Sequence, residues 1–204
     1  MSTGFWGRKG GTPRGGPPPI HLGVRQTHKG GERPRDCQDA WWAGAHPPRV
    51  AVADGATLSF FPRDWAWLVA EHFCHPAGDG LAADLLRAGE SDDWRASLAT
   101  VRGEWRSAVR DAIQRSRTRE LLENRLLEKD AAVATLVGVD LAPEGGGWRA
   151  VIVGDSCLMR FDAAGTFRGS EPFDHPSQFG NHPEALVSVA GSPRETAPRV
   201  TRGT

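Results

Sequence analysis

The order of apolar and polar residues predicts strands at the beginning of the chain. Ile20–Thr27 alternates apolar and polar positions, as a half-buried strand does. Ala40–Ala43 and Val50–Ala53 are short apolar runs of strand length. A proline-rich turn at residues 46–48 separates these two runs, which predicts an antiparallel pair. We expect positions 39 and 54, which flank this pair, to lie near opposite ends of the hairpin.

The pattern then changes to the spacing of helices. Pro62 suits the first turn of a helix, and the apolar residues from Trp65 to Phe73 follow at helical intervals. A short helix is predicted at Leu81–Ala88. A longer apolar stripe from Trp94 to Ile113, with Arg and Glu on the opposite face, predicts a long amphipathic helix.

Strand patterns return in the second half. Ala131–Leu141 and Trp148–Gly154 flank a glycine-rich loop and predict a hairpin, and Cys157–Phe161 predicts a further strand. Beyond Gly169 no regular pattern is found. Strands, helices and then strands again, joined by hairpins, indicate an α+β fold in which helices cover antiparallel sheets.

The composition and pattern of the chain predict three segments. Residues 1–19 are rich in Gly and Pro and predict a disordered basic arm, residues 20–190 a single domain, and residues 191–204 an irregular tail. The whole chain carries 25 basic and 25 acidic residues, so nucleic acid is an unlikely partner. Residues 36–192, however, contain 15 basic and 23 acidic residues. This excess of negative charge favours the binding of divalent cations.

The cysteines and the lengths of the apolar segments indicate the cellular location of the protein. The three cysteines, Cys37, Cys74 and Cys157, are widely spaced and show no zinc or redox motif. No apolar segment approaches the roughly 18 residues of a membrane span, and the N-terminus lacks the apolar core of a signal peptide. We therefore expect a cytoplasmic protein that does not contact the membrane.

Candidate chemistry centres on Asp54-Gly55, where an apolar run ends in an acid and a glycine. Alone, this pair is more typical of an ordinary turn than of a metal site. Together with Asp36, Asp39 and Asp155 it predicts a site of hard oxygen ligands, which select magnesium, manganese or calcium over zinc. Arg33 and Arg35 lie beside it in sequence and could hold a phosphate group through bidentate hydrogen bonds.

Four motifs extend over roughly two thirds of the chain and contain most of the candidate site residues. They are Arg33 or Arg35 with Gln38-Asp39-Ala40, Val50 to Gly55, Ala132-Val133-Ala134-Thr135-Leu136, and Val153-Gly154-Asp155-Ser156. In this order they resemble the metal-dependent PP2C (PPM) protein serine/threonine phosphatases.

The resemblance implies a sandwich of two antiparallel β-sheets flanked by helices, incomplete at its C-terminal end. It implies that Asp54 bridges two Mn²⁺ or Mg²⁺ ions, that Gly55 gives a carbonyl to one of them, and that Asp39 holds metal-bound water. Asp155 would serve a weaker third ion. The implied reaction is hydrolysis of phosphoserine or phosphothreonine in a phosphoprotein substrate by metal-bound hydroxide.

The chain departs from the family pattern at several positions. Gln38 stands where many members have a glutamate ligand, each candidate phosphate arginine is one position out of place, and Ala56 replaces a histidine of animal members. No aspartate follows Asp174, although the family completes its site with two late aspartates. The alternative hypothesis is therefore a weakly active or inactive PP2C-like regulatory or binding module. A third, weaker alternative is anion binding by the basic arm.

Overall fold

The computed structural model describes residues 21–27, 33, 36–45, 47–75, 80–88, 90–127, 131–141, 147–179 and 184–203. The chain divides into two compact units, Met1–Cys37 and Gln38–Thr204, and each is described by itself. The predicted disordered arm at residues 1–19 lies outside the described residues, as does Arg35.

The N-terminal unit does not contain the strand predicted at Ile20–Thr27. Residues 21–27 have no regular secondary structure. Instead, the Gln26 side-chain amide donates to Cys37 Sγ over 3.4 Å, and this thiol lies 3.8 Å from the Thr27 carbonyl oxygen. An alternating pattern forms a strand only beside a neighbouring strand, and the described residues of this unit include none.

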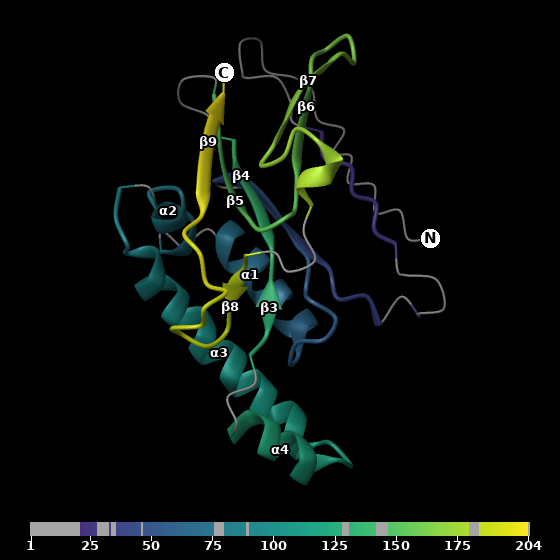
Figure 1. Ribbon diagram of the computed structural model, residues 1–204, viewed down its shortest axis with the longest axis vertical. Helices are drawn as coiled ribbons and strands as arrows, with labels where there is room; N and C mark the ends of the chain where they lie inside the picture. The colour runs from purple at the N-terminus through teal and green to yellow at the C-terminus, as the bar shows by residue number, and fades with distance from the viewer. Residues whose placement is uncertain are drawn as a thin grey trace. The chain divides into compact units, whose positions relative to one another are not determined.

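The larger unit is built on a five-stranded antiparallel sheet with the strand order β1-β2-β4-β5-β9 (Figure 1). The predicted strands at Ala40–Ala43, Val50–Ala53, Ala131–Leu141 and Trp148–Gly154 all contribute to it or to its continuation. The bounds are β1 Ala40–Ala45, β2 Pro48–Ala53, β4 Leu136–Asp140, β5 Trp148–Val153 and β9 Arg199–Gly203.

Strand β9 corrects the prediction of an irregular tail at residues 191–204. Its residues pair with β5, with Val151 opposite Val200. Arg199 to Gly203 contains one large apolar residue, so the sequence carries little strand pattern. The strand forms because its backbone satisfies the hydrogen-bonding groups along the edge of β5.

Two short ladders accompany the main sheet. β3 (Val133–Ala134) pairs with β8 (Leu186–Val187), and β6 (Leu158–Phe161) pairs with β7 (Phe167–Glu171). The second pair confirms the predicted strand at Cys157–Phe161 and adds a partner that the sequence pattern does not show. A short 3₁₀ helix follows at Pro176–Gln178.

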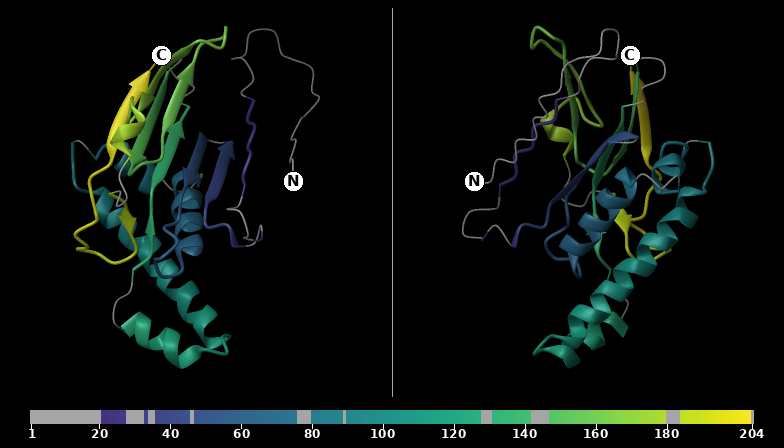
Figure 2. Two further views of the ribbon diagram at one scale, coloured as in Figure 1. Left: turned by 45° about the vertical axis from the view of Figure 1, so that its right-hand side comes forward. Right: turned by 180° about the vertical axis from the view of Figure 1, so that it is seen from behind.

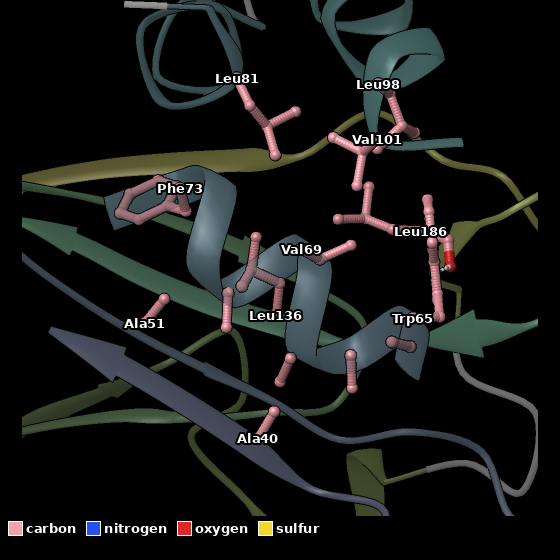
Figure 3. Close-up of a cluster of buried hydrophobic side chains, with 14 of the residues drawn as sticks. Ala40, Ala51, Trp65, Val69, Phe73, Leu81, Leu98, Val101, Leu136 and Leu186 are labelled. Atoms are coloured by element: carbon pink, nitrogen blue, oxygen red, sulfur yellow. Dashed lines mark hydrogen bonds between the residues drawn. The ribbon is translucent and has the colours of Figure 1, made fainter. Parts of the chain in front are cut away.

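Helix α1 (Pro62–Cys74) packs on one face of the main sheet, as Figure 3 shows. The strand residues beneath it are small, including Ala40, Ala51 and Gly138. A Cβ atom on Gly138 would lie 2.5 Å from the Phe73 ring, so the helix rests where only glycine leaves room. Alanine and glycine on the strands therefore allow the large side chains of α1 to fill the core.

Three further helices follow. α2 (Leu81–Leu85) and α3 (Trp94–Gln114) match the predicted helices, and α3 buries the predicted stripe of Trp94, Leu98 and Trp105. Helix α4 (Arg119–Leu127) was not predicted, because it buries no residue and its apolar positions do not gather on one face. It runs back beside the C-terminal end of α3 (Figure 2).

The Trp65 indole connects helix α1 to the β3–β8 ladder. Its Nε1–H donates to the Leu186 carbonyl oxygen over 3.0 Å, entirely inside the core (Figure 3). The larger unit is thus an α+β fold with antiparallel sheets, as the sequence predicts. Within the described part of the chain, no helix combines the length and apolar character needed to cross a membrane.

Candidate functional site

Asp39 and Asp54 lie together at the open end of the β1–β2 hairpin. Ala40 is paired with Ala53, so the two aspartates are the next residues outward on adjacent strands. The expectation that these positions lie near opposite ends of the hairpin is therefore wrong. An antiparallel hairpin joined at residues 46–47 brings the beginning of its first strand beside the end of its second. Asp39 is half-buried and Asp54 is exposed.

Gly55 continues this contact one residue further. A Cβ atom at Gly55 would lie 2.8 Å from the backbone oxygens of both Gln38 and Pro62, so a side chain does not fit. The Asp54 carbonyl accepts a hydrogen bond from Thr135 and the Ala56 amide donates one to Val133, each over 2.9 Å. The carbonyl of Gly55 takes part in neither bond.

Thr135 connects this segment to the Gly154-Asp155-Ser156 turn. Its backbone amide bonds to Asp54, and its hydroxyl lies 2.5 Å from the Ser156 hydroxyl. Asp155 is half-buried, and its carboxylate makes no hydrogen bond or ion pair with another described residue. β5 ends at Val153, opposite the first residue of β4, so this turn lies at the same edge of the sheet as Asp54.

The fold therefore brings Asp39, Asp54, Gly55 and Asp155 to one edge of the five-stranded sheet. Among the described residues, no three carboxylate, histidine or cysteine side chains are close enough together to enclose a metal ion. Arg33, which is exposed, and Asp36 belong to the N-terminal unit, where the Arg33 amide donates to the Asp36 carboxylate over 3.2 Å. Arg35 lies outside the described residues.

The side chain of Gln38 bears on whether a cation could bind at this edge. Its Oε1 atom is buried and has no hydrogen-bond partner among the described residues. A buried amide oxygen without a partner costs free energy, and a divalent ion or its bound water removes that cost. Mg²⁺ commonly takes one or two carboxylates and keeps several waters. The carboxylate and amide oxygens at this edge are of the chemical kind that such a partly hydrated ion takes.

Cysteine chemistry does not compete at this edge. Burial raises the pKa of the Cys157 thiol, and a hydrogen bond with the Phe173 backbone opposes this, while the Asp155 carboxylate adds to the rise. A thiol with a raised pKa is a poor nucleophile and a poor metal ligand, because both roles require the thiolate. The carboxylate oxygens of Asp54 and Asp155 are therefore better candidate ligands than the Cys157 thiol.

Comparisons with known proteins add no assignment. Neither models of known protein families nor curated protein sequences give a match to this chain. The functional interpretation therefore rests on the sequence motifs and on the geometry of the sheet edge.

Sequence reasoning did not assign a role to Thr135 or Ser156, although both lie within quoted motifs. Thr135 is almost fully buried, with 4% of its surface exposed, and a buried hydroxyl needs a partner. The only trace in the sequence is a polar residue placed directly before the apolar run of β4. Its partner lies 21 residues later, at a distance that local patterns do not reveal.

Proposed function

We propose that this protein is a metal-dependent phosphatase of the PP2C type that hydrolyses phosphoserine or phosphothreonine in proteins. The observation that carries the proposal is the convergence of Asp39, Asp54 and the Asp155 turn at one edge of the sheet. These acids belong to three of the four motifs, and the strand register places all three at the same end of the sheet.

The proposed roles follow from the chemistry of each group. Asp54 and the Gly55 carbonyl would hold Mn²⁺ or Mg²⁺, with the buried Oε1 of Gln38 facing the ion or its water. Such ions lower the pKa of bound water and neutralise phosphate oxygens. The Asp39 carboxylate would accept hydrogen bonds from water at the site and so orient it. Arg33 and Arg35 remain the candidates for binding the phosphate group of the substrate.

The test is hydrolysis of p-nitrophenyl phosphate and of a phosphothreonine peptide with and without Mn²⁺. Asp54→Asn keeps the size of the side chain and removes its charge, and should lower kcat at least about a hundredfold. Asp174→Asn is the matched control, because Asp174 is exposed and belongs to none of the motifs. Equal rates for wild type and Asp54→Asn would refute the proposal.

A PP2C-like binding module is the second candidate. It is favoured by the lack of three clustered metal-binding side chains among the described residues. In that case the chain would bind Mn²⁺ weakly, bind phosphopeptides and release no phosphate. Calorimetric titration with Mn²⁺, run beside the hydrolysis assay, separates the two functions.

A further inference from the structure

Thr135 contacts three separate parts of the candidate site with three different groups. Its backbone amide donates to the Asp54 carbonyl over 2.9 Å, and its hydroxyl bonds to Ser156 over 2.5 Å. Its methyl group lies against Gly154, where an added Cβ would be 2.6 Å from Thr135 Cγ2. One side chain thus touches both sides of the turn that carries Asp155.

The turn that carries Asp155 has Thr135 against the residue on each side of the aspartate. The carboxylate of Asp155 makes no hydrogen bond or ion pair with another described residue, so its direction is set by the backbone on either side. Gly154 has a φ of +84°, a conformation that suits glycine, and it begins the turn directly after β5. Ser156 follows Asp155 and is held by the hydroxyl bond.

We propose that Thr135 is a positioning residue, which fixes the Asp155 turn relative to Asp54 through its bond to Ser156. This inference rests on the proposed function, since it concerns the binding of the divalent ion that Asp155 would serve. Outer groups that orient metal ligands typically contribute 10- to 100-fold in metal affinity or activity. Thr135 would act on the ion through Asp155 without touching it.

Threonine is the only common residue that supplies both the hydroxyl and the methyl group at this point. Thr135→Val keeps the branched shape and the contact with Gly154 but removes the bond to Ser156. Thr135→Ser keeps the hydroxyl and removes the methyl group. Ser156→Ala breaks the same bond from the half-exposed turn, where a folding defect is not expected.

The experiment is calorimetric titration of the full chain with Mn²⁺, together with kcat and KM for p-nitrophenyl phosphate. Thr135→Val and Ser156→Ala should each weaken the Mn²⁺ site that uses Asp155 about 10- to 100-fold. The double variant should be no weaker than either single variant, because both remove one bond. Thr135→Ser should retain most of the affinity.

Ser188→Ala is the matched control for loss of a buried hydroxyl. The Ser188 hydroxyl accepts a hydrogen bond from the Ala132 amide over 2.8 Å and is fully buried. This variant should lower stability without changing Mn²⁺ affinity. Wild-type affinity and rates in Thr135→Val and Ser156→Ala, with an active wild type, would overturn the positioning role alone. A wild type that neither binds Mn²⁺ nor hydrolyses phosphate would overturn the proposed function as well.

Discussion

Gln38 and Gly55 lie against each other two residues beyond the last paired positions of the β1–β2 hairpin. A Cβ atom on Gly55 would lie only 2.8 Å from the Gln38 carbonyl oxygen, so only glycine fits at this position. The residues between this contact and the Ala40–Ala53 pair are Asp39 and Asp54. The two carboxylates are therefore cross-strand neighbours, and a cation bound between or beside them would offset the repulsion between their like charges.

This geometry predicts an effect on stability that depends on metal. Asp39→Asn removes one carboxylate of the cross-strand pair, and like charges at such positions repel each other by about 0.2–1 kcal/mol. With saturating Mn²⁺ the wild type gains more binding free energy than the variant, so the substitution should be more destabilising with Mn²⁺ than without it. Urea unfolding with EDTA and with Mn²⁺ measures both values. Asp174→Asn, at an exposed position, should show no such difference.

The packing of α1 on the sheet predicts a contrast between two glycines. Gly138→Ala places a methyl group 2.5 Å from the Phe73 ring and should destabilise the protein by about 1–3 kcal/mol. Gly103 lies in the exposed face of α3 with nothing within 4 Å, and Gly103→Ala should stabilise by up to about 1 kcal/mol. Thermal unfolding of both variants checks the difference. Equal effects would mean that α1 does not rest on Gly138.

Much of this fold is predictable where the pattern is local. Pro62 and the apolar spacing after it predict α1, and Trp94 to Ile113 predicts α3, because a helix buries residues that are close in sequence. Helix α4 and strand β9 escape prediction for opposite reasons. The first buries nothing, and the second is held by backbone pairing with β5 instead of by its side chains.

The candidate site is predictable by residue type but not by arrangement. The motifs point to Asp39, Asp54 and Asp155, yet only the register of three strand pairs brings them to one edge. Thr135 and Ser156 were missed because their interaction joins segments that no periodic pattern relates. Contacts between side chains that are far apart in sequence depend on the tertiary structure, and the local pattern of a single sequence does not reveal them.

A buried ion pair between α3 and the segment near the C-terminus gives a further prediction. Arg102 and Glu195 are 9% and 7% exposed at their side chains, with Nη2 and Oε1 2.7 Å apart. The Arg102 Nε–H also donates to the Val187 carbonyl oxygen over 3.0 Å. Glu195→Ala leaves the guanidinium buried without its partner and should cost about 3–5 kcal/mol.

The double variant Arg102→Met/Glu195→Leu distinguishes the net contribution of the ion pair from the cost of leaving one charge buried alone. It removes both charges and fills the space with apolar atoms, so it should be much closer to wild type than either single change. Chemical denaturation of Arg102→Met, Glu195→Leu and the double variant measures the coupling. The exposed pair of Arg119 and Glu123 on α4 is the control, since its disruption should cost well under 1 kcal/mol. Additive costs at Arg102 and Glu195 would contradict the buried pair.

Cys74 predicts a loss of stability at high pH. Burial raises the pKa of its thiol from 9.0 to about 12, against small opposing effects from the Gly44 backbone and Arg49. Between these values the unfolded chain loses the thiol proton while the folded chain keeps it, so stability is complete below pH 9 and falls as the pH rises towards 12. At pH 10 the loss should be about 1 kcal/mol relative to pH 8. Cys74→Ala should lack this component, and groups that titrate equally in both proteins cancel, so the difference between their pH dependences isolates it. A pH dependence that is identical in both would show that the thiol ionises as readily in the folded protein as in the unfolded one.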